Sequence, residues 1–301
     1  MNLVITGATG FIGGELVARL KQENHSLTLF SRKLPKNSAG SLVRWMPWDL
    51  AHPSTWQGEL EGADGVIHLA GEPIAGKRWT AGQKLRLRQS RIDTTRAIVT
   101  AIAKAKSKPR FLVNASAVGY YGPHGDETVS EESSPGKDFL GELCVEWEAE
   151  ASKAKDLGLR VVFLRTGIVL GKGKGALAKM VPPFKLFMGG RLGSGKQWFP
   201  WIHVDDEVGL IHFLIEHDRA EGPFNLTAPN PVTMDHFCKA LGKALNRPSW
   251  APVPASLLYL MLGEMADMLL AGQRALPQEA LRLGYNFKFG KVEEALESLR
   301  L

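Results

Sequence analysis

The chain has 301 residues, of which 44% are hydrophobic and 23% charged. This composition is typical of a globular protein and excludes a disordered or collagen-like chain. Lys and Arg number 37 against 31 Asp and Glu, so the formal net charge is +6. Because the basic residues are scattered rather than grouped, the excess indicates no nucleic-acid partner.

Cysteine content and hydropathy predict where the protein resides. Cys144 and Cys238 cannot form a disulfide framework and have no C-x-x-C spacing, which favours a reducing compartment. Residues 1–7 form an apolar run without the basic region or cleavage site of a signal peptide. The most apolar stretch, 257–270, is interrupted by acidic residues and is too short for a membrane span, so we expect an amphipathic helix facing the core. We therefore predict a cytoplasmic protein without a membrane partner.

The first half of the chain alternates short β-branched runs with longer helical patterns, which is typical of βαβ units around a parallel sheet. This predicts an α/β fold with a doubly wound sheet of the Rossmann type. Strands are predicted at 2–6, 26–31, 43–48, 65–69, 110–116 and 160–166, and helices at 12–21, 81–106 and 140–156.

Glycine and proline become frequent after Gly171, and the predicted elements become shorter. We therefore predict two domains: a dinucleotide-binding domain at 1–170 and a smaller substrate domain at 171–301. The segment 201–216 is the part of the second domain that can return to pack on the sheet.

Residues 7–13 read GATGFIG and lie between the first strand and the first helix. Gly7 permits a tight turn, Gly10 lets a pyrophosphate approach the backbone, and Gly13 lets the helix pack closely on the strand. The exposed amides and the positive helix end attract phosphate groups. The motif predicts a dinucleotide-binding turn; the alternative is a glycine-rich turn without a ligand.

The end of the second strand distinguishes the two nicotinamide cofactors. It reads FSRK at 30–33, with no carboxylate for a ribose 2′-hydroxyl. Arg32 offers a fork of donors that suits a 2′-phosphate, which favours NADP(H) over NAD. The alternative is that Arg32 and Lys33 are surface cations. Asp49 and Leu50, after the third strand, are predicted near the adenine, or else form a strand-end turn.

With the glycine turn, four further strings make the chain resemble the extended short-chain dehydrogenases/reductases over nearly its whole length. That family includes nucleotide-sugar epimerases and dehydratases. The strings are LAG at 69–71, ASA at 115–117, RTG at 165–167 and WIHVDD at 201–206.

A second set of strings is similar to an atypical epimerase-family subgroup. Its members carry a C-terminal domain of unknown function, and some are labelled cell-division inhibitors. The strings are GEPI at 71–74, KRW at 77–79, GYYG at 119–122 and GQRALP at 272–277.

The resemblance implies a set of cofactor contacts and a catalytic hydroxyl at Ser116. By this resemblance, the glycine turn and the end of the second strand would contact the phosphates and the adenosine half of the cofactor. Residues 69–71 would line its ribose. The candidate cofactor contacts are Gly7, Thr9, Gly10, Phe11, Ile12, Ser31, Arg32, Asp49, Leu50, Leu69, Ala70, Gly71, Glu72, Ala115, Arg165 and Gly167.

The sequence departs from the family at its catalytic pair, a tyrosine and a lysine four residues later. A phenol is a poor base at neutral pH until a neighbouring cation stabilises its anion. No Tyr-x-x-x-Lys occurs in this sequence; Phe139 lies near the phenol's place and Glu142 near the ammonium's. Either Tyr120, Tyr121 or Glu142 performs acid–base chemistry, or NADPH is a ligand without turnover. The alternative for the two tyrosines is a packed aromatic pair.

The glycine-rich run 189–195, followed by QWFPW at 197–201, resembles the family's mobile substrate loop. The alternative for these residues is a plain surface loop with tryptophans in the core. The alternative for the basic candidates named next is that they are solvated cations. The candidate substrate contacts are Lys77, Arg78, Trp79, Arg91, Trp198 and Trp201.

His203, Asp205 and Asp206 are an incomplete set of metal ligands, so we predict no metal there. The two acids are expected to cap the next helix.

These features predict an NADP(H)-dependent reductase or epimerase that acts on a small, anionic substrate containing a nucleotide or sugar. The alternative is a non-catalytic, NADPH-sensing interaction protein linked to cell division. The oligomeric state stays open, with a homodimer as one option.

Overall fold

The computed structural model describes residues 1–35 and 42–301, which build a seven-stranded sheet in the order β12-β7-β5-β4-β1-β2-β3. All neighbouring strands run parallel. The order reverses between β1 and β4, which is the topological switch point of a doubly wound fold. The predicted Rossmann-type sheet is confirmed. Its strands are β1 (Asn2–Thr6), β2 (Ser26–Ser31), β3 (Val43–Pro47), β4 (Gly65–His68), β5 (Phe111–Ala117), β7 (Arg160–Thr166) and β12 (Gly222–Leu226).

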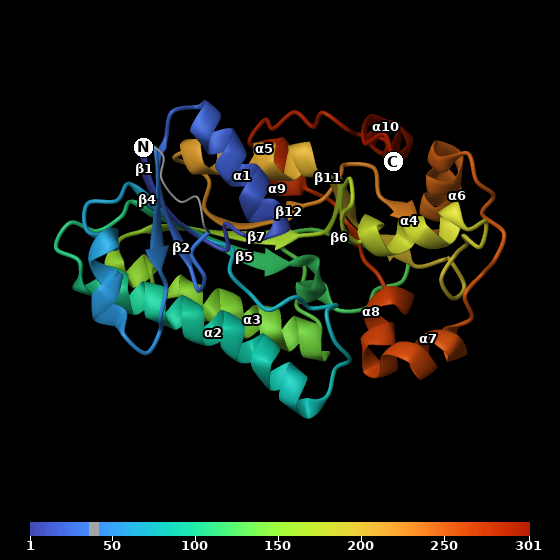
Figure 1. Ribbon diagram of the computed structural model, residues 1–301, viewed down its shortest axis with the longest axis horizontal. Helices are drawn as coiled ribbons and strands as arrows, with labels where there is room; N and C mark the ends of the chain where they lie inside the picture. The colour runs from blue at the N-terminus through green and yellow to red at the C-terminus, as the bar shows by residue number, and fades with distance from the viewer. Residues whose placement is uncertain (36–41) are drawn as a thin grey trace.

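Helices cover both faces of this sheet (Figure 1). One face carries α1 (Phe11–Gln22) and α5 (Val204–Glu216), and the other carries α2 (Ala81–Lys104) and α3 (Phe139–Ser152). Because both faces are buried, the central strands are apolar throughout rather than alternating. Each strand and helix predicted in the first half of the chain is present, with its ends shifted by a few residues.

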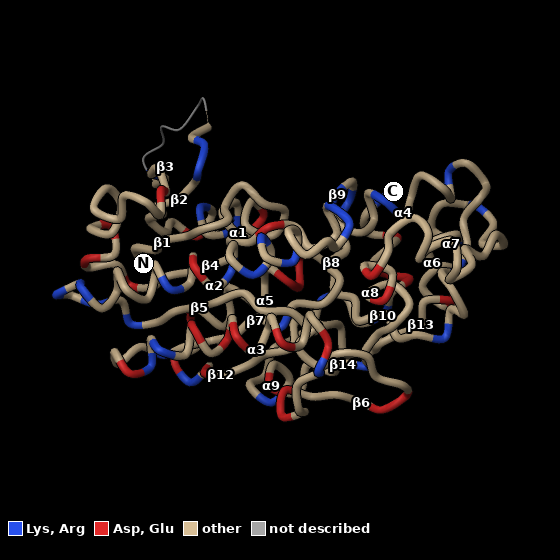
Figure 2. Tube along the Cα trace, turned by 90° about the horizontal axis from the view of Figure 1, so that it is seen from below, with Lys and Arg blue, Asp and Glu red and all other residues tan. Residues whose placement is uncertain are grey.

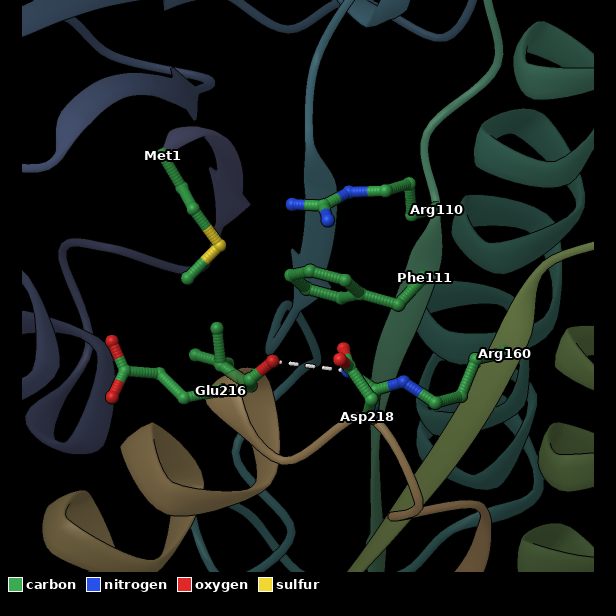
Figure 3. Close-up of a pocket in the computed structure, with 7 residues that line it drawn as sticks. Met1, Arg110, Phe111, Arg160, Glu216 and Asp218 are labelled. Carbon is green, nitrogen blue, oxygen red and sulfur yellow. Dashed lines mark hydrogen bonds between the residues drawn. The ribbon is translucent and has the colours of Figure 1, made fainter.

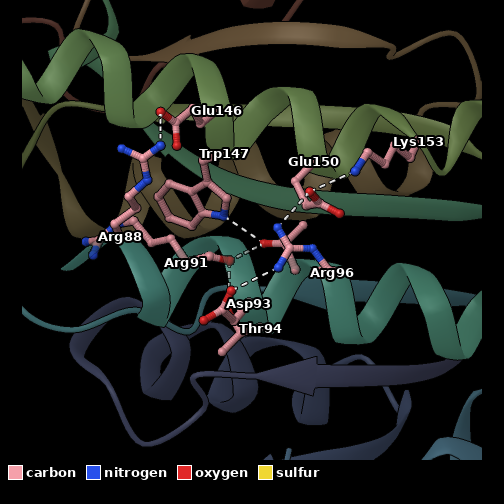
Figure 4. A network of polar contacts seen from close by, with 10 residues as sticks. Arg88, Arg91, Asp93, Thr94, Arg96, Glu146, Trp147, Glu150 and Lys153 are labelled. Carbon is pink, nitrogen blue, oxygen red and sulfur yellow. Dashed lines mark hydrogen bonds and ion pairs between the residues drawn. The ribbon is translucent and has the colours of Figure 1, made fainter. Parts of the chain in front are cut away.

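Polar contacts join α2 to α3 across their interface (Figure 4). Trp147 Nε1 donates a 2.9 Å hydrogen bond to Thr95 Oγ1. Glu150 accepts from Arg96 at 3.4 Å and from Lys153 at 2.9 Å. The ion pairs join exposed cations to the buried Glu150, and the buried Trp147 fixes the relative position of the two helices.

A smaller lobe lies at the end of the sheet where its strands terminate (Figure 1). It has its own core, which includes Phe184, Phe237 and Leu296. Its strands are β8 (Ile168–Gly171), β9 (Lys174–Gly175), β10 (Trp198–Phe199), β11 (Trp201–His203) and β13 (Val232–Thr233), and its helices are α4 (Leu177–Lys185), α6 (Met234–Leu245), α7 (Ala255–Leu262), α8 (Asp267–Leu270) and α10 (Val292–Ser298).

Short elements complete the described chain. The strands β6 (Thr128–Val129) and β14 (Arg274–Ala275) pair in parallel. The helix α9 (Gln278–Arg282) packs near β12. Single 3₁₀ turns occur at Pro53–Thr55, Gln57–Leu60, Val118–Tyr121, Lys155–Leu157 and Gly263–Ala266.

The strand β12 was not predicted from the sequence. Its residues, GPFNL, include glycine, proline and asparagine, which are rare inside strands. Pro223 is tolerated because β12 is an edge strand, paired only with β7. The seventh strand of the main sheet therefore comes from beyond residue 170, and α5 packs beside α1 on the same sheet.

Two local predictions were wrong. The side chain that caps α5 is His203, whose Nδ1 accepts from Asp205 N at 3.0 Å, whereas the Asp206 carboxylate accepts from the backbone of Lys288 at 2.7 Å. The stretch 257–270 is not one core-facing helix, because Gly263 adopts φ +62° and divides it.

The surface charge is mixed. Figure 2 shows Lys and Arg interspersed with Asp and Glu along most of the chain, as the sequence suggested. Within the described residues, every helix is too short or too polar to cross a bilayer.

Candidate functional site

The glycine turn joins β1 to α1 at the carboxyl edge of the sheet. Gly7 has φ +74°, and a Cβ added there would lie 2.7 Å from the Leu69 backbone. A Cβ at Gly13 would lie 2.3 Å from the Gly7 carbonyl oxygen. The turn therefore requires glycine at both positions, and it brings α1 against β1 as predicted.

The helix N-terminus behind this turn is open. Gly10 caps α1 without a side chain, and Thr9 and Gly10 are exposed. The first turn of α1 contains no acidic residue. Its amides and positive dipole end can therefore bind an anion without electrostatic competition.

Most candidate cofactor residues lie partly or fully exposed along this edge. Phe11 belongs to them, but its ring also packs against Gly171 of β8. The exposed or partly exposed candidates are Gly7, Thr9, Gly10, Phe11, Ile12, Arg32, Asp49, Leu50, Leu69, Ala70, Gly71, Glu72, Ala115 and Gly167. Ser31 and Arg165 are buried.

A buried histidine supports the turn from below, and sequence reasoning missed it. His68 Nδ1 lies 2.6 Å from Thr6 Oγ1, and its Nε2 lies 3.2 Å from Thr94 Oγ1. Burial lowers the pKa of His68 to about 3, so the imidazole is neutral. Thr6 Oγ1 also accepts from Ala70 N at 3.3 Å, which links β1 to the segment after β4. A polar residue ending the apolar strand GVIH was the available signal.

Arg91 holds the loop after β4 in place. It donates to the carbonyl oxygens of Glu72 at 3.1 Å and Leu87 at 3.0 Å, and its guanidinium lies 5.0 Å from the centre of the Trp147 ring. Through these contacts Arg91 positions Gly71 and Glu72, while its side chain stays partly exposed.

The turn after β2 presents Arg32. Ser31 Oγ donates to Lys33 O at 2.7 Å, which closes the turn and leaves Arg32 exposed. Asp49 instead pairs with His52 at 2.8 Å and accepts from Ala51 N at 2.9 Å. These two hydrogen bonds, that to His52 first, hold the pKa of Asp49 below its usual value. Asp49 therefore matches the strand-end-turn alternative.

A buried polar network lies beneath the ends of β5 and β7. Arg165 donates to both carboxylate oxygens of Glu148 at 2.9 Å, and Ser116 Oγ donates to Glu148 at 2.6 Å. Tyr121 OH accepts from Arg165 at 3.0 Å and donates to Asn225 Oδ1 at 2.6 Å. We call these five residues the Arg165 network.

The Arg165 network changes the roles expected of its members. Tyr121 is 1% exposed, and burial raises the pKa of its phenol to about 12, so this phenol is less suited to proton exchange with a ligand than an exposed one. Arg165 is 3% exposed and donates to Glu148, Tyr121 and the carbonyl oxygen of Glu131. Burial alone would lower the pKa of Arg165, but its bonds and charge attraction to Glu148 outweigh burial and raise it. The hydroxyl of Ser116 already donates a hydrogen bond to Glu148.

Tyr120 differs from Tyr121 because it remains partly exposed. Its ring centre lies 3.4 Å from the Arg165 guanidinium carbon and 5.3 Å from the Tyr121 ring. The packed-pair alternative thus describes the rings of both tyrosines. Only Tyr120 keeps access to solvent.

The start of α3 carries Phe139 and Glu142, which the resemblance puts near the places of the family's catalytic pair. Asp138 caps the helix by accepting from Gly141 N at 3.2 Å. Phe139 packs edge-on against Trp79 at 5.3 Å, with Lys84 Nζ 4.9 Å from its ring centre. Glu142 is exposed in the first turn. Phe139 is therefore part of an aromatic contact with Trp79.

The loop after β4 also reaches the smaller lobe. Arg78 donates to Leu260 O at 3.4 Å, and Lys84 pairs with Glu264. Lys77 is exposed. Of the two cations predicted on this loop, Arg78 contacts the smaller lobe and Lys77 is exposed.

The two candidate tryptophans have different environments. Trp198 is partly exposed, donates to Asp126 Oδ1 at 3.1 Å, and has the Arg274 guanidinium 4.6 Å from its ring centre. Trp201 is fully buried in the core of the smaller lobe, which accounts for it by packing. Close packing also explains Gly167, where a Cβ would lie 2.2 Å from the Pro200 carbonyl oxygen.

A cavity of about 570 Å³ lies away from this site, at the amino ends of the strands (Figure 3). Arg110, Phe111 and Arg160 are among the residues that line it. Arg160 is held there by the carbonyl oxygens of Leu214, Ile215 and Ala220. The cavity is therefore separate from the glycine turn.

A parallel sheet in this order, with a glycine turn at its switch point, defines a dinucleotide-binding protein of the Rossmann class. Residues 3–227 match the family model described as "NAD dependent epimerase/dehydratase family", and residues 253–299 match a domain of unknown function, DUF1731. The chain belongs to the NAD dependent epimerase/dehydratase family.

The similarity to known proteins extends over nearly the whole chain. "Epimerase family protein SDR39U1 homolog, chloroplastic" of Arabidopsis thaliana is 45% identical over 303 residues, covering 99% of this chain and 86% of the relative. Epimerase family protein YfhF of Bacillus subtilis (strain 168) is 39% identical over 300 residues, covering 99% and 98%. The crystal structure of human epimerase family protein SDR39U1 (isoform 2) with NADPH has 34% identity and a TM-score of 0.89, covering 100% of this chain and 99% of that one.

Proposed function

We propose that this chain binds NADPH across the carboxyl edge of its sheet and uses it to reduce or epimerise a small, anionic substrate. The observation that carries the proposal is the open glycine turn, which needs glycine at Gly7 and Gly13 and presents free amides at the start of α1. The NADPH in the human relative supports the choice of cofactor.

The residues present fit such a cofactor. The amides of Phe11 and Ile12 at the start of α1 would bind the pyrophosphate, because the helix dipole adds to their hydrogen bonds, whereas the Gly10 amide donates to Gly7 O at 2.9 Å. Arg32, exposed beyond Ser31, would pair with the 2′-phosphate. Leu69 and Ala70, held by Thr6 and His68, would line the ribose.

When bound, the nicotinamide supplies hydride transfer, and the protein supplies binding and a proton. Tyr120 is our candidate proton donor, because its phenol is the accessible one at the end of β5 while that of Tyr121 is buried. Its hydroxyl proton would pass to the substrate oxygen, and solvent would restore it. The exposed cation Lys77, two residues before Trp79, favours an anionic substrate, and the aromatic contact between Trp79 and Phe139 favours a substrate with a flat or apolar part.

A second function is favoured by a specific observation. The Ser116 hydroxyl donates its hydrogen bond to Glu148, and the resemblance puts Phe139 near the phenol's place, so two groups of the family's usual chemistry would be unavailable. These features suit a protein that binds NADPH as a ligand and changes its affinity for a partner protein.

The two functions are separated by measuring NADPH binding and turnover in the same samples. We expect NADPH oxidation with one or more members of a panel of phosphorylated and nucleotide-linked carbonyl compounds. Tyr120→Phe should then lower kcat by at least about 100-fold, the usual contribution of a general acid, while leaving NADPH affinity unchanged. Tyr259→Phe, an exposed tyrosine on α7, is the control.

Tight NADPH binding without turnover across the panel would favour the sensor. Turnover that survives Tyr120→Phe would remove Tyr120 from the mechanism. Failure to bind NADPH would overturn both functions.

A further inference from the structure

We propose that Glu23, His25, His212 and Glu216 form a binding site for one divalent zinc ion, at the edge of the sheet opposite the glycine turn. One imidazole nitrogen or carboxylate oxygen from each residue lies within 4.8 Å of all the others. The set contains two imidazoles and two carboxylates, which are ligands that zinc accepts in tetrahedral sites. The proposal does not depend on the function proposed above.

The fold brings the four residues together from two segments. Glu23 and His25 flank the turn from α1 to β2, and His212 and Glu216 are one helical turn apart on α5. Because α1 and α5 pack side by side on one face of the sheet, the pairs converge (Figure 1). Residues at i and i+4 on a helix face the same side, which lets His212 and Glu216 act on one ion.

The four ligand atoms lie close to one another. Glu23 Oε2 lies 3.9 Å from His25 Nε2 and in close contact with His212 Nε2, and Glu216 Oε1 lies 3.5 Å from His212 Nε2. Ligands around tetrahedral zinc are about 3.3 Å apart, so small side-chain rotations suffice. Arg19 pairs with the other oxygen, Glu23 Oε1, and leaves Oε2 to the histidines.

Charge and hydrogen bonding also favour a cation. His25 Nδ1 lies 3.2 Å from the amino-terminal nitrogen of Met1, so its other ring nitrogen, Nε2, is the one that faces Glu23 and can bind an ion. The His212 Nε2 atom is buried, and no described group gives it a well-oriented hydrogen bond. A zinc ion would use this nitrogen and neutralise the two converging carboxylates.

An ion can reach the cluster from solvent. Glu216 is exposed and lines the cavity of about 570 Å³ described above (Figure 3). His25 and His212 lie deeper, at 7% and 13% side-chain exposure. The arrangement thus has a buried imidazole side and an open carboxylate side.

The test is calorimetric titration of Zn²⁺ into tag-free, chelator-treated protein. We expect one zinc per chain, and at 100 times Kd a rise in Tm of roughly 5 °C, because the ion binds the folded state only. His212→Gln and Glu216→Gln should each weaken zinc binding by at least about tenfold, as loss of even an outer-shell partner does. His236→Gln removes a histidine that pairs with a single glutamate, Glu293, and should leave zinc affinity unchanged.

NADPH binding serves as the check that each variant is folded, because the glycine turn lies at the other edge of the sheet. Glu216 is more than half exposed, so Glu216→Gln is expected to fold even if His212→Gln does not. A dissociation constant of about 10⁻⁴ M is at the weak end for metal sites in proteins. If the wild-type protein binds no zinc at concentrations of about 10⁻⁴ M, the proposal is overturned. Equal zinc affinity in the wild type and in folded Glu216→Gln overturns it as well.

Discussion

Arg32 is the residue on which cofactor choice depends. If it pairs with the 2′-phosphate, Arg32→Ala should weaken NADPH binding by about 1.5–3 kcal/mol, the range for a charge-assisted hydrogen bond. NADH lacks that phosphate, so its affinity should be nearly unchanged. Fluorescence titration with both cofactors measures the difference, with the exposed Arg219→Ala as the control. Equal losses for NADPH and NADH would assign Arg32 to the surface.

We expect Arg165 to contribute to stability through its buried contact with Glu148. Arg165→Ala would leave the Glu148 carboxylate buried and without its bidentate partner, which typically costs about 3–5 kcal/mol of unfolding free energy. Urea denaturation measures this loss. Arg88→Ala removes an exposed ion pair with Glu146 and should cost less than about 1 kcal/mol. Similar losses for both variants would contradict the assignment of Arg165 to a buried network.

At the scale of elements, the packing of α5 against β7 buries a carboxyl group. Glu207 is fully buried and accepts from Thr166 Oγ1 at 2.9 Å. Burial raises the pKa of Glu207 to about 8, although the hydrogen bond from Thr166 acts in the opposite direction. The folded protein therefore keeps this proton at a pH where an unfolded glutamate has lost it.

This burial predicts a pH-dependent stability. Between pH 4.5 and about 8 the folded state binds more protons than the unfolded state at Glu207, so stability falls as pH rises through this window. Each unit of pKa difference corresponds to about 1.4 kcal/mol. Relative to the wild type, Glu207→Gln should gain unfolding free energy from pH 5 to pH 8. Parallel pH profiles for the wild type, Glu207→Gln and the exposed control Glu297→Gln would refute the burial effect.

At the scale of the whole molecule, the C-terminal segment is tied to the sheet. Thr227 and Asn225, at the end of β12, donate to the carbonyl oxygens of Ala275 at 3.2 Å and Leu276 at 2.9 Å. Asp206 of α5 accepts from the backbone amides of Lys288 and Phe289. The segment that matches the domain of unknown function thus completes contacts of the Rossmann part.

We therefore expect the full chain to unfold in one cooperative transition. Removing residues 253–301 exposes the core around Phe237, which α10 covers, and leaves the Asp206 carboxylate without its partners. The shortened protein should aggregate, or its Tm should be at least about 10 °C lower than that of the full chain. The reason is that several kcal/mol of stabilising burial are lost, and each kcal/mol lowers Tm by a few degrees. Differential scanning calorimetry measures both forms. A truncated chain with unchanged Tm would show that the segment folds independently.

The local sequence determined the core of the fold and the cofactor end of the site. Each βα unit of the first half has its own apolar period, and the need for glycine at Gly7 and Gly13 arises from contacts within one such unit or between adjacent strands. The strand β12 escaped prediction because its residues are weak strand formers, and its pairing with β7 comes from a distant part of the chain.

The tertiary structure alone decided which polar groups are available. The sequence treats Tyr120 and Tyr121 alike, and only packing buries Tyr121 against Arg165 and Asn225. Likewise, Glu23 and His212 are far apart in the chain, and the pairing of α1 with α5 brings them into contact. Burial and long-range contact are properties of the assembled chain, because they depend on residues that no local pattern relates to one another.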